Sequence, residues 1–307
     1  MRSGLHRQRG LALVMVLWFI SLLTVLALGF SQTMRNDTRI TANLLEALRA
    51  RQLAEAAIQH AIYDLVNQET EMADAVISGN AVSFEFAGVE VSYRIEDENG
   101  KVDINQAPPE LFTSLLISQE VGDEQAKVLS DQLLDWRDEN DLRLLDGAEA
   151  PEYLAAGRTR LPANAPFRSI GELQQLLGME PGLYARLAPL VTVHGNNDKI
   201  NPEYAPEGVL KALPGVDPGE LEEFINYRKT LSPEIISPAF PELTGVESWL
   251  DDESGPVYTV YGTAALPSGA FASRRTIVWI HSFGDRTHYV LESTDNILRP
   301  KPGEQSE

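Results

Sequence analysis

The first hydrophobic pattern in the chain is an uninterrupted apolar run near its amino end. Residues 11–30 contain no charged residue. Twenty helical residues at about 1.5 Å of rise each cover about 30 Å, which is the thickness of the hydrocarbon core of a bilayer. The run therefore predicts a transmembrane helix.

The pattern after this run changes to that of an amphipathic helix. Apolar residues recur every three or four positions, charged residues fall on the other sides, and no proline or glycine interrupts residues 31–68. This spacing is typical of a helix with one buried face. We predict a single helix from residue 11 to residue 68, about 87 Å long at 1.5 Å per residue, that leaves the membrane and enters a folded domain.

Alternation of apolar and polar residues replaces the helical spacing in two separate zones. The first zone is residues 82–105. The second zone comprises residues 256–266, 272–283 and 288–293. A period of two is typical of half-buried strands, and the short turns between these runs indicate antiparallel hairpins.

The residues between the two strand zones have helical spacing, and each segment opens with proline, serine, aspartate or glycine, as helices commonly do. We predict an α+β fold in which a long N-terminal transmembrane helix packs on an antiparallel sheet, with a large all-helical domain inserted between strands. The expected parts are a leader (1–10), a membrane span (11–30), the helix and first strands (31–105), the inserted helical domain (106–250), the last strands (251–294) and a flexible tail (295–307).

Composition and charge exclude several classes of protein. With 25 Lys and Arg against 45 Asp and Glu, the net charge is −20, and such a surface repels nucleic-acid phosphates. No cysteine is present, which excludes disulfides, zinc–thiolate sites and cysteine nucleophiles. The chain has none of the motifs common to serine hydrolases, zinc peptidases or nucleotide-binding enzymes. We therefore predict that the protein is not an enzyme.

The ten residues before the apolar run form a basic leader that ends in Gly10. The leader carries three arginines and no acidic residue, so the positive-inside rule keeps it in the cytoplasm and sends the rest outward. A signal peptide removed outside the membrane would be followed by small residues at its cleavage site, whereas a helix-compatible segment follows here. An uncleaved signal anchor remains an alternative on these residues alone.

This leader and its helix resemble the N-terminus of type IV prepilins and pseudopilins. The resemblance implies that a prepilin peptidase cuts between Gly10 and Leu11 and methylates the new amine. Most pilins have a glutamate five residues after the cut, where this chain has Met15. In pilin-like filaments that glutamate meets the terminal amine of a subunit already assembled, so a chain without it suits the first position, at the tip.

The whole chain is similar to the K-type minor pseudopilins of the type II, or general, secretion pathway, known as the GspK family. The similarity implies a role in initiating or capping the pseudopilus, the filament used to export folded proteins across the outer membrane. It implies I-type and J-type minor pseudopilins and other pseudopilins as partners. It also implies a single-pass position in the cell inner membrane with the bulk of the chain in the periplasm.

Two strings in the sequence look like copies of one pattern, in which Lys and Ile–Asn precede Ala–Pro and a helix. In each copy an asparagine, Asn105 or Asn201, ends a strand, and we expect its side chain to bond local backbone groups before the helix starts. The second copy continues as a helix-hairpin-helix-like module, so a membrane-anchored DNA-uptake receptor is the alternative function. Asp217 and Pro218 in its turn oppose a phosphate group, and we expect no nucleic-acid partner.

The segment richest in chemistry is an acidic stretch over residues 135–154. Its crowded carboxylates are hard oxygen ligands and favour calcium, although their spacing does not match an EF-hand. A run of this kind is characteristic of the GspK family, in which the inserted domain of characterised members binds calcium; the residues that match the run are Trp136, Asp138, Asn140, Gly147, Ala148, Glu149 and Tyr153. We expect Asp138, Asn140, Asp141, Asp146 and Glu149 to form the site, with Asp141 and Asp146 chosen by chemistry alone. A solvated acidic loop without an ion is the alternative.

Overall fold

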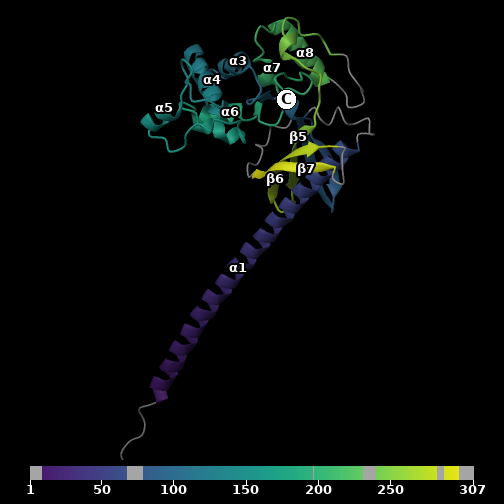
Figure 1. Cartoon of the computed structure of the whole chain (residues 1–307). Helices are drawn as coiled ribbons and strands as arrows, with labels where there is room; N and C mark the ends of the chain where they lie inside the picture. Colours follow the sequence, from purple (N-terminus) through teal and green to yellow (C-terminus); the bar gives the residue numbers. More distant parts are fainter. Residues whose placement is uncertain (1–8, 68–78, 196, 231–239, 282–286, 297–307) are drawn as a thin grey trace, which may run out of the picture.

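The computed structural model describes residues 9–67, 79–195, 197–230, 240–281 and 287–296, without the side chains of residues 9–12 and 296. One long helix projects from a body in which a sheet lies beside a group of short helices (Figure 1). Residues 1–8 of the expected leader and residues 297–307 of the expected tail lie outside the described residues.

Helix α1, Arg9–Val66, forms the projection and has 58 residues. It corresponds to the single helix predicted over residues 11–68. The apolar side chains from Leu13 to Leu48 are more than half exposed. This helix is long and apolar enough to cross a membrane, and none of its most apolar window is buried within the protein. The exposed apolar surface is what a membrane-spanning segment requires.

The last part of α1 packs against the sheet. Its buried residues recur three or four positions apart: Ala50, Leu53, Ala54, Ala57, Ile58, Ala61, Ile62 and Leu65. These spacings place the side chains on one face of the helix. The same helix therefore has an exposed apolar first half and a buried stripe in its second half.

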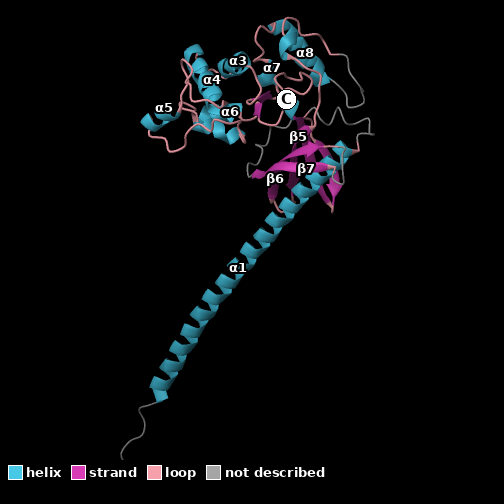
Figure 2. Cartoon of the chain, in the orientation of Figure 1, coloured by secondary structure: helices cyan, strands magenta, loops and turns pink. Residues whose placement is uncertain are grey.

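The main sheet is antiparallel and has the strand order β1-β2-β5-β6-β7. Strand β2 pairs directly with β5, so the whole segment between these two neighbouring strands is an insertion. Figure 2 shows the strands at the upper end of α1, with the helices of the insertion beyond them. The strand bounds are Val82–Phe86 (β1), Val89–Asp97 (β2), Val257–Ala265 (β5), Phe271–Ile280 (β6) and His288–Asn296 (β7).

Close contact between α1 and the sheet depends on Gly262 in β5. A Cβ atom at this position would lie 2.2 Å from the carbonyl oxygen of Ala54 and 2.8 Å from Cγ1 of Ile58. Real atoms do not approach so closely, so only glycine allows the helix backbone to lie this near the strand. The opposite face of the same strand, at Thr259 and Tyr261, meets the insertion.

The insertion is mainly helical. It contains six α-helices and three short 3-10 helices within the described residues. The α-helices are Pro109–Ser118 (α3), Asp123–Arg137 (α4), Ala150–Ala155 (α5), Pro181–Leu187 (α6) and Glu207–Leu210 (α7), followed by Pro218–Thr230 (α8), and the 3-10 helices are Glu98–Gly100 (η1), Ile170–Gln175 (η2) and Glu247–Trp249 (η3). A separate apolar core, built around Tyr153, Phe112 and Phe224, holds these elements together.

The structure differs from the predicted elements in three places. Residues 102–103 (β3, Val102–Asp103) pair in parallel with β4 (Val191–Thr192) inside the insertion, so the inserted domain is not wholly helical and these residues do not continue the first hairpin. Residues 170–175, which have helical spacing, form a 3-10 helix. Strand β7 continues to Asn296, so residues 295–296 belong to the sheet and not to the expected tail, because they pair with β6.

Candidate functional site

The predicted cleavage position lies at the start of α1. Helix α1 begins at Arg9, so the Gly10–Leu11 peptide bond lies in its first turn. Met15 lies one turn further along, with 59% of its surface exposed. Cleavage after Gly10 therefore remains a prediction.

The acidic loop connects α4 to α5 and wraps around one buried carboxylate. Asp135, at 0% exposure, accepts hydrogen bonds from the backbone N–H of Leu144 at 3.1 and 3.2 Å. Further out, Asp138 Oδ1 accepts from the N–H of Asn140 at 3.1 Å, and Asn140 Oδ1 accepts from the N–H of Leu142 at 2.8 Å. Side chains of the loop thus satisfy backbone groups of the loop itself, as short polar residues do in turns.

Gly147 is required in this loop by a close approach. A Cβ atom at Gly147 would lie 1.9 Å from Oδ2 of Asp135. Any side chain at this position would collide with the buried carboxylate.

Glu149 is the most unusual residue of the loop. Only 3% of it is exposed, and neither carboxylate oxygen makes a hydrogen bond. It is the N-cap residue of α5, and its own N–H donates to Glu152 Oε2 at 3.0 Å. Burial and the charges of Asp135 and Asp138 raise the pKa of Glu149 to about 7. A buried carboxylate without partners among other acids is electrostatically costly.

Three of the other expected ligands, Asn140, Asp141 and Asp146, are exposed. Asp141 Oδ1 accepts from Asn164 at 2.8 Å. The N–H of Asp146 donates to Asp131 Oδ2 at 3.1 Å. Within the described residues no three His, Asp or Glu side chains form a group that could hold a metal ion. The calcium site at these five residues therefore stays a prediction, and Glu149 is the member of the set whose buried carboxylate has no hydrogen bond.

Sequence reasoning left Asp135 out of the predicted ligand set. The feature of the sequence that could have indicated Asp135 is its position one residue before Trp136, on the buried face of α4. Two further buried polar atoms of α4, Gln132 Oε1 and Trp136 Nε1, have no hydrogen-bond partner. Buried polar atoms without hydrogen-bond partners therefore gather on α4 and at the start of α5.

Both asparagines of the internal repeat bond to distant backbone groups. Asn201 Oδ1 accepts from the N–H of Glu203 at 2.9 Å, which is the expected local bond, and its Nδ2 donates to the carbonyl of Glu253 at 3.0 Å, 52 residues away. Asn105 makes a reciprocal pair with the backbone of Phe167, 62 residues away, at 2.9 and 2.7 Å. The expected local side-chain bond is therefore present at Asn201, whereas the side chain of Asn105 bonds both polar groups of a distant residue.

The hairpin between α7 and α8 is closed to an anion. Asp217 Oδ1 accepts from the N–H of Gly219 at 2.8 Å and from that of Glu220 at 3.0 Å. These N–H groups at the start of a helix are the ones a phosphate would need. The absence of a nucleic-acid partner stays a prediction, and this geometry gives it a structural reason.

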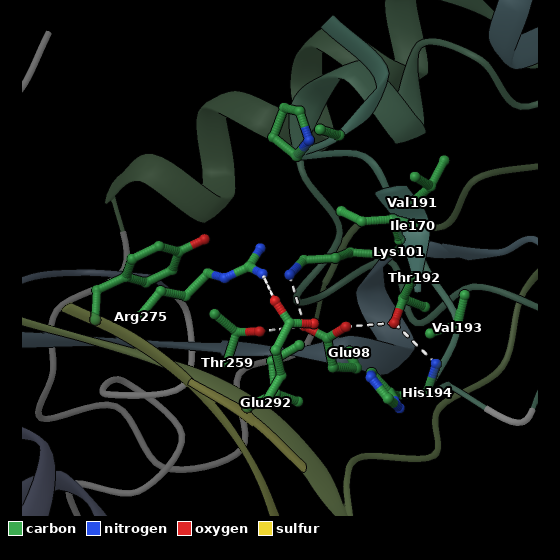
Figure 3. Close-up of a pocket in the computed structure, with 14 residues that line it drawn as sticks. Glu98, Lys101, Ile170, Val191, Thr192, Val193, His194, Thr259, Arg275 and Glu292 are labelled. Atoms are coloured by element: carbon green, nitrogen blue, oxygen red, sulfur yellow. Dashed lines mark hydrogen bonds and ion pairs between the residues drawn. The ribbon is translucent and has the colours of Figure 1, made fainter. Parts of the chain in front are cut away.

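A buried charged network joins the sheet to the insertion (Figure 3). Glu98 receives hydrogen bonds from Lys101 at 2.6 Å, from Thr259 of β5 at 2.7 Å and from Thr192 of β4. Lys101 also lies 3.2 Å from Glu96 of β2. The cavity beside this network measures about 20 Å³, which is room for about one water molecule. The network connects the sheet to the insertion, and the cavity beside it is too small for a ligand larger than a water molecule.

Comparison with known proteins identifies the family. A family model described as "Type II secretion system (T2SS), protein K" matches residues 89–196. The protein K of the type II secretion system of Klebsiella pneumoniae is 31% identical over 235 residues, which cover 68% of this chain and 71% of that protein. The chain belongs to the type II secretion system protein K family.

Other relatives agree with this membership in the protein K family. The protein K of Pseudomonas aeruginosa is 28% identical over 249 residues, with 74% of each chain covered. A chain of the solved GspK–GspI–GspJ complex of enterotoxigenic Escherichia coli matches with a TM-score of 0.57 and 17% identity, covering 86% of this chain and 99% of that one. At that identity the match shows the fold alone, and it confirms the predicted fold class.

Membership in the protein K family defines the class of protein. The chain is a minor pseudopilin of a type II secretion system, a structural component and not an enzyme. The family model covers β2, the junction with Glu98 and the whole acidic loop. The part of the chain with the most distinctive buried chemistry is therefore also the part that matches the family model.

Proposed function

We propose that this protein K occupies the tip of the type II secretion pseudopilus, where it initiates or caps the filament used to export folded proteins. The observation that carries this proposal is the division of α1 into two parts. The apolar side chains of its first half are exposed, and its last part packs against the sheet. A subunit of this shape can leave the membrane within a bundle of similar helices and hold its folded domains outside.

Two features support the terminal position. Met15, five residues after the expected cut, replaces the glutamate that would pair with a preceding subunit's amine. The insertion extends the body beyond the sheet, on the side away from the projecting half of α1 (Figure 1). A large domain at that end of the molecule suits a subunit that has no further subunit beyond it in the filament.

We infer that the chain is held in the inner membrane by α1 and is processed by a prepilin peptidase after Gly10. The basic leader favours the cytoplasm, and the apolar half of α1 matches a bilayer in length. Intact-mass measurement after co-expression with a prepilin peptidase tests the cut. Loss of ten residues is expected, and retention of Met1 with the peptidase active would contradict it.

I-type and J-type pseudopilins are the proposed partners. Support comes from the solved relative, whose structure is a complex of GspK, GspI and GspJ. In this chain the exposed apolar surface of α1 beyond the membrane span, which includes Ile40, Leu44, Leu45 and Leu48, offers a helix-packing surface.

Co-purification of the full-length chain with candidate I-type and J-type pseudopilins in a mild detergent tests the assembly. A stable ternary complex is expected, and Leu44→Glu should weaken it because it buries a charge in a helix interface. Glu46→Gln on the same helix is the matched control, because it leaves the apolar surface intact. Failure of the wild-type chain to retain either pseudopilin would overturn the partner assignment.

We also propose that the acidic loop binds calcium. Asp138, Asp141 and Glu149 would supply its oxygens, with Asp135 beneath them, and calcium would relieve the repulsion around Glu149. The support is the buried carboxylate of Glu149 without hydrogen bonds, surrounded by acids that raise its pKa. Calcium prefers several flexible oxygen ligands, so the exposed members of the loop are free to turn inward.

A further inference from the structure

A second surface feature lies on the insertion next to the acidic loop. A hollow of about 630 Å³ opens between the end of α4 and residues 160–172. Its polar lining includes Arg160, Arg168, Ser169 and Glu172, and Leu161 and Trp136 contribute apolar surface. This volume lies in the range of pockets that hold small molecules or short peptide segments.

The charge of this region is opposite to that of the whole chain. Residues 157–171 carry three arginines and no acidic residue, in a protein with a net charge of −20. Arg160 and Arg168 are exposed. Across the ranges that the structure describes, neither guanidinium forms an ion pair with a carboxylate. Two guanidinium groups without ion pairs at one hollow are suited to a carboxylate, which arginine binds with two parallel hydrogen bonds.

The backbone that carries Arg168 is held in place from both sides. The reciprocal bonds between Asn105 and Phe167 fix the residue before it. The N–H of Arg168 donates to Glu172 Oε1 at 3.0 Å. The ring of Phe167 stacks on Trp136, with ring centres 6.0 Å apart and planes inclined by 17°. Little backbone ordering therefore remains to oppose binding at this site.

Glu172 is the one acid in the lining, and its Oε1 already accepts the N–H of Arg168. The charged side chains of the lining therefore sum to a single positive charge. The acidic loop adjoins the region through Asn164, which donates to Asp141. Screening limits the reach of that loop's field to about 8 Å at physiological salt. A ligand with one or two carboxylates fits this balance, whereas a polyanion does not.

We propose that this hollow, bounded by Arg160 and Arg168, binds an acidic peptide segment of a protein partner. Its carboxylates pair with the two guanidinium groups, and its apolar side chains lie against the exposed Leu161. The proposal does not depend on where in the filament the subunit stands, or on whether the acidic loop binds calcium.

The test uses the full-length protein in a mild detergent and a fluorescein-labelled peptide with two adjacent glutamates flanked by leucines, followed by fluorescence anisotropy. The wild-type protein should bind this peptide at least tenfold more tightly than the same peptide with glutamines. Arg160→Gln combined with Arg168→Gln should weaken binding at least tenfold. Arg158→Gln is the matched control, because Arg158 is exposed in the same segment without lining the hollow, and it should change binding less than twofold.

Three results would overturn the proposal. The first is equal affinity for the glutamate and glutamine peptides. The second is an equal loss of binding in Arg158→Gln and in the double variant. The third is displacement of the peptide by inorganic phosphate at a concentration similar to its own, which would make the hollow a general anion site. Circular dichroism of each variant separates loss of binding from loss of fold.

Discussion

Arg137 and Arg228 make the same contact in the two halves of the insertion. Arg137, at the end of α4, donates to the carbonyl of Ala107 at 3.3 Å and to that of Ile104 at 2.5 Å. Arg228, near the end of α8, donates to the carbonyl of Ala205 at 2.6 Å. Each alanine precedes the first helix of its own half, so the internal repeat includes an arginine that ties the second helix back to the start of the first.

These hydrogen bonds predict a loss of stability when the Arg228 side chain is replaced by a shorter one. Arg228 also donates to the carbonyls of Pro202 and Glu203. All three bonds come from Nη1, and the nitrogen of a lysine lies one bond nearer to the backbone, so it reaches these carbonyls poorly. Hydrogen bonds to a charged donor are worth about 1.5–3 kcal/mol each. We expect Arg228→Lys to lower the free energy of unfolding by about 1–3 kcal/mol. Thermal unfolding of the full-length protein in detergent measures the loss. The control Arg143→Lys, at an exposed ion pair of 3.6 Å, should stay within about 0.5 kcal/mol of wild type.

The buried pair of Glu98 and Lys101 predicts acid sensitivity. Burial alone would raise the pKa of Glu98, but the Lys101 ammonium and the two threonine hydroxyls bring it below its ordinary value of 4.5. The folded state then binds fewer protons at Glu98 than the unfolded state does. The stability from this group is therefore complete above pH 4.5 and is lost as the pH falls through the lower folded value.

Melting temperatures from pH 7 down to pH 3 test this assignment. The wild-type protein should lose stability below about pH 4.5 more steeply than Glu98→Gln, which cannot titrate there. The control Glu90→Gln removes an exposed acid of β2, the strand that ends just before Glu98, and should follow the wild-type curve. Parallel curves for wild type and Glu98→Gln would show that this carboxyl does not set the acid limit.

Calcium should stabilise the acidic loop, and this stabilisation should depend on the carboxylate of Glu149. Binding to the folded state alone adds about 2.7 kcal/mol when calcium is a hundredfold above its Kd. We expect the melting temperature to rise from EDTA to millimolar calcium, with little response to magnesium. Glu149→Gln should abolish the response and raise the melting temperature in EDTA, because it removes a buried charge without a partner.

Glu139→Gln is the matched control for this prediction, because Glu139 is exposed in the same loop. It should keep the full calcium response. If calcium does not change the wild-type melting temperature, the calcium proposal is wrong and the loop is a solvated acidic surface. The membership in the protein K family would be unaffected.

Met15 predicts the effect of restoring a glutamate. If the subunit starts the filament, Met15→Glu should give no gain in assembly, since no preceding amine is present to pair with the carboxylate. An unpaired acid within the bilayer costs about 2.5 kcal/mol or more, so the variant should accumulate less protein. Filament yield and protein level in a reconstituted secretion system are the measurements. A clear gain in filament over Met15→Gln would contradict the terminal position.

Gly262 predicts how closely α1 must lie on the sheet. Gly262→Ala places a methyl group against the carbonyl of Ala54, and overpacking of this kind costs about 1–3 kcal/mol or more. We expect a lower melting temperature. Gly122→Ala is the control, because Gly122 has an ordinary φ of −66° and open space around its Cβ position. Equal stability of the two variants would mean that the helix can move away without cost.

The sequence by itself determined the elements whose pattern is local. The apolar run and the spacing of three and four after it specify α1 to within two residues at each end. The period of two specifies β2, β5 and β6, and the helical stretch between them specifies an insertion. These patterns are legible because each records one element's own buried and exposed faces.

The tertiary structure alone decided which distant groups meet. Asn105 bonds to the backbone of Phe167, and Glu98 accepts hydrogen bonds from Thr192 and Thr259. Asp135 lies against Gly147. None of these residues is a sequence neighbour of its partner. The acidic stretch shows the same limit, because its composition predicted one ligand group while the structure turns Asn140, Asp141 and Asp146 outward and buries Glu149. Periodicity records whether a side chain is buried, but its partner is chosen by packing and hydrogen bonding across the whole fold.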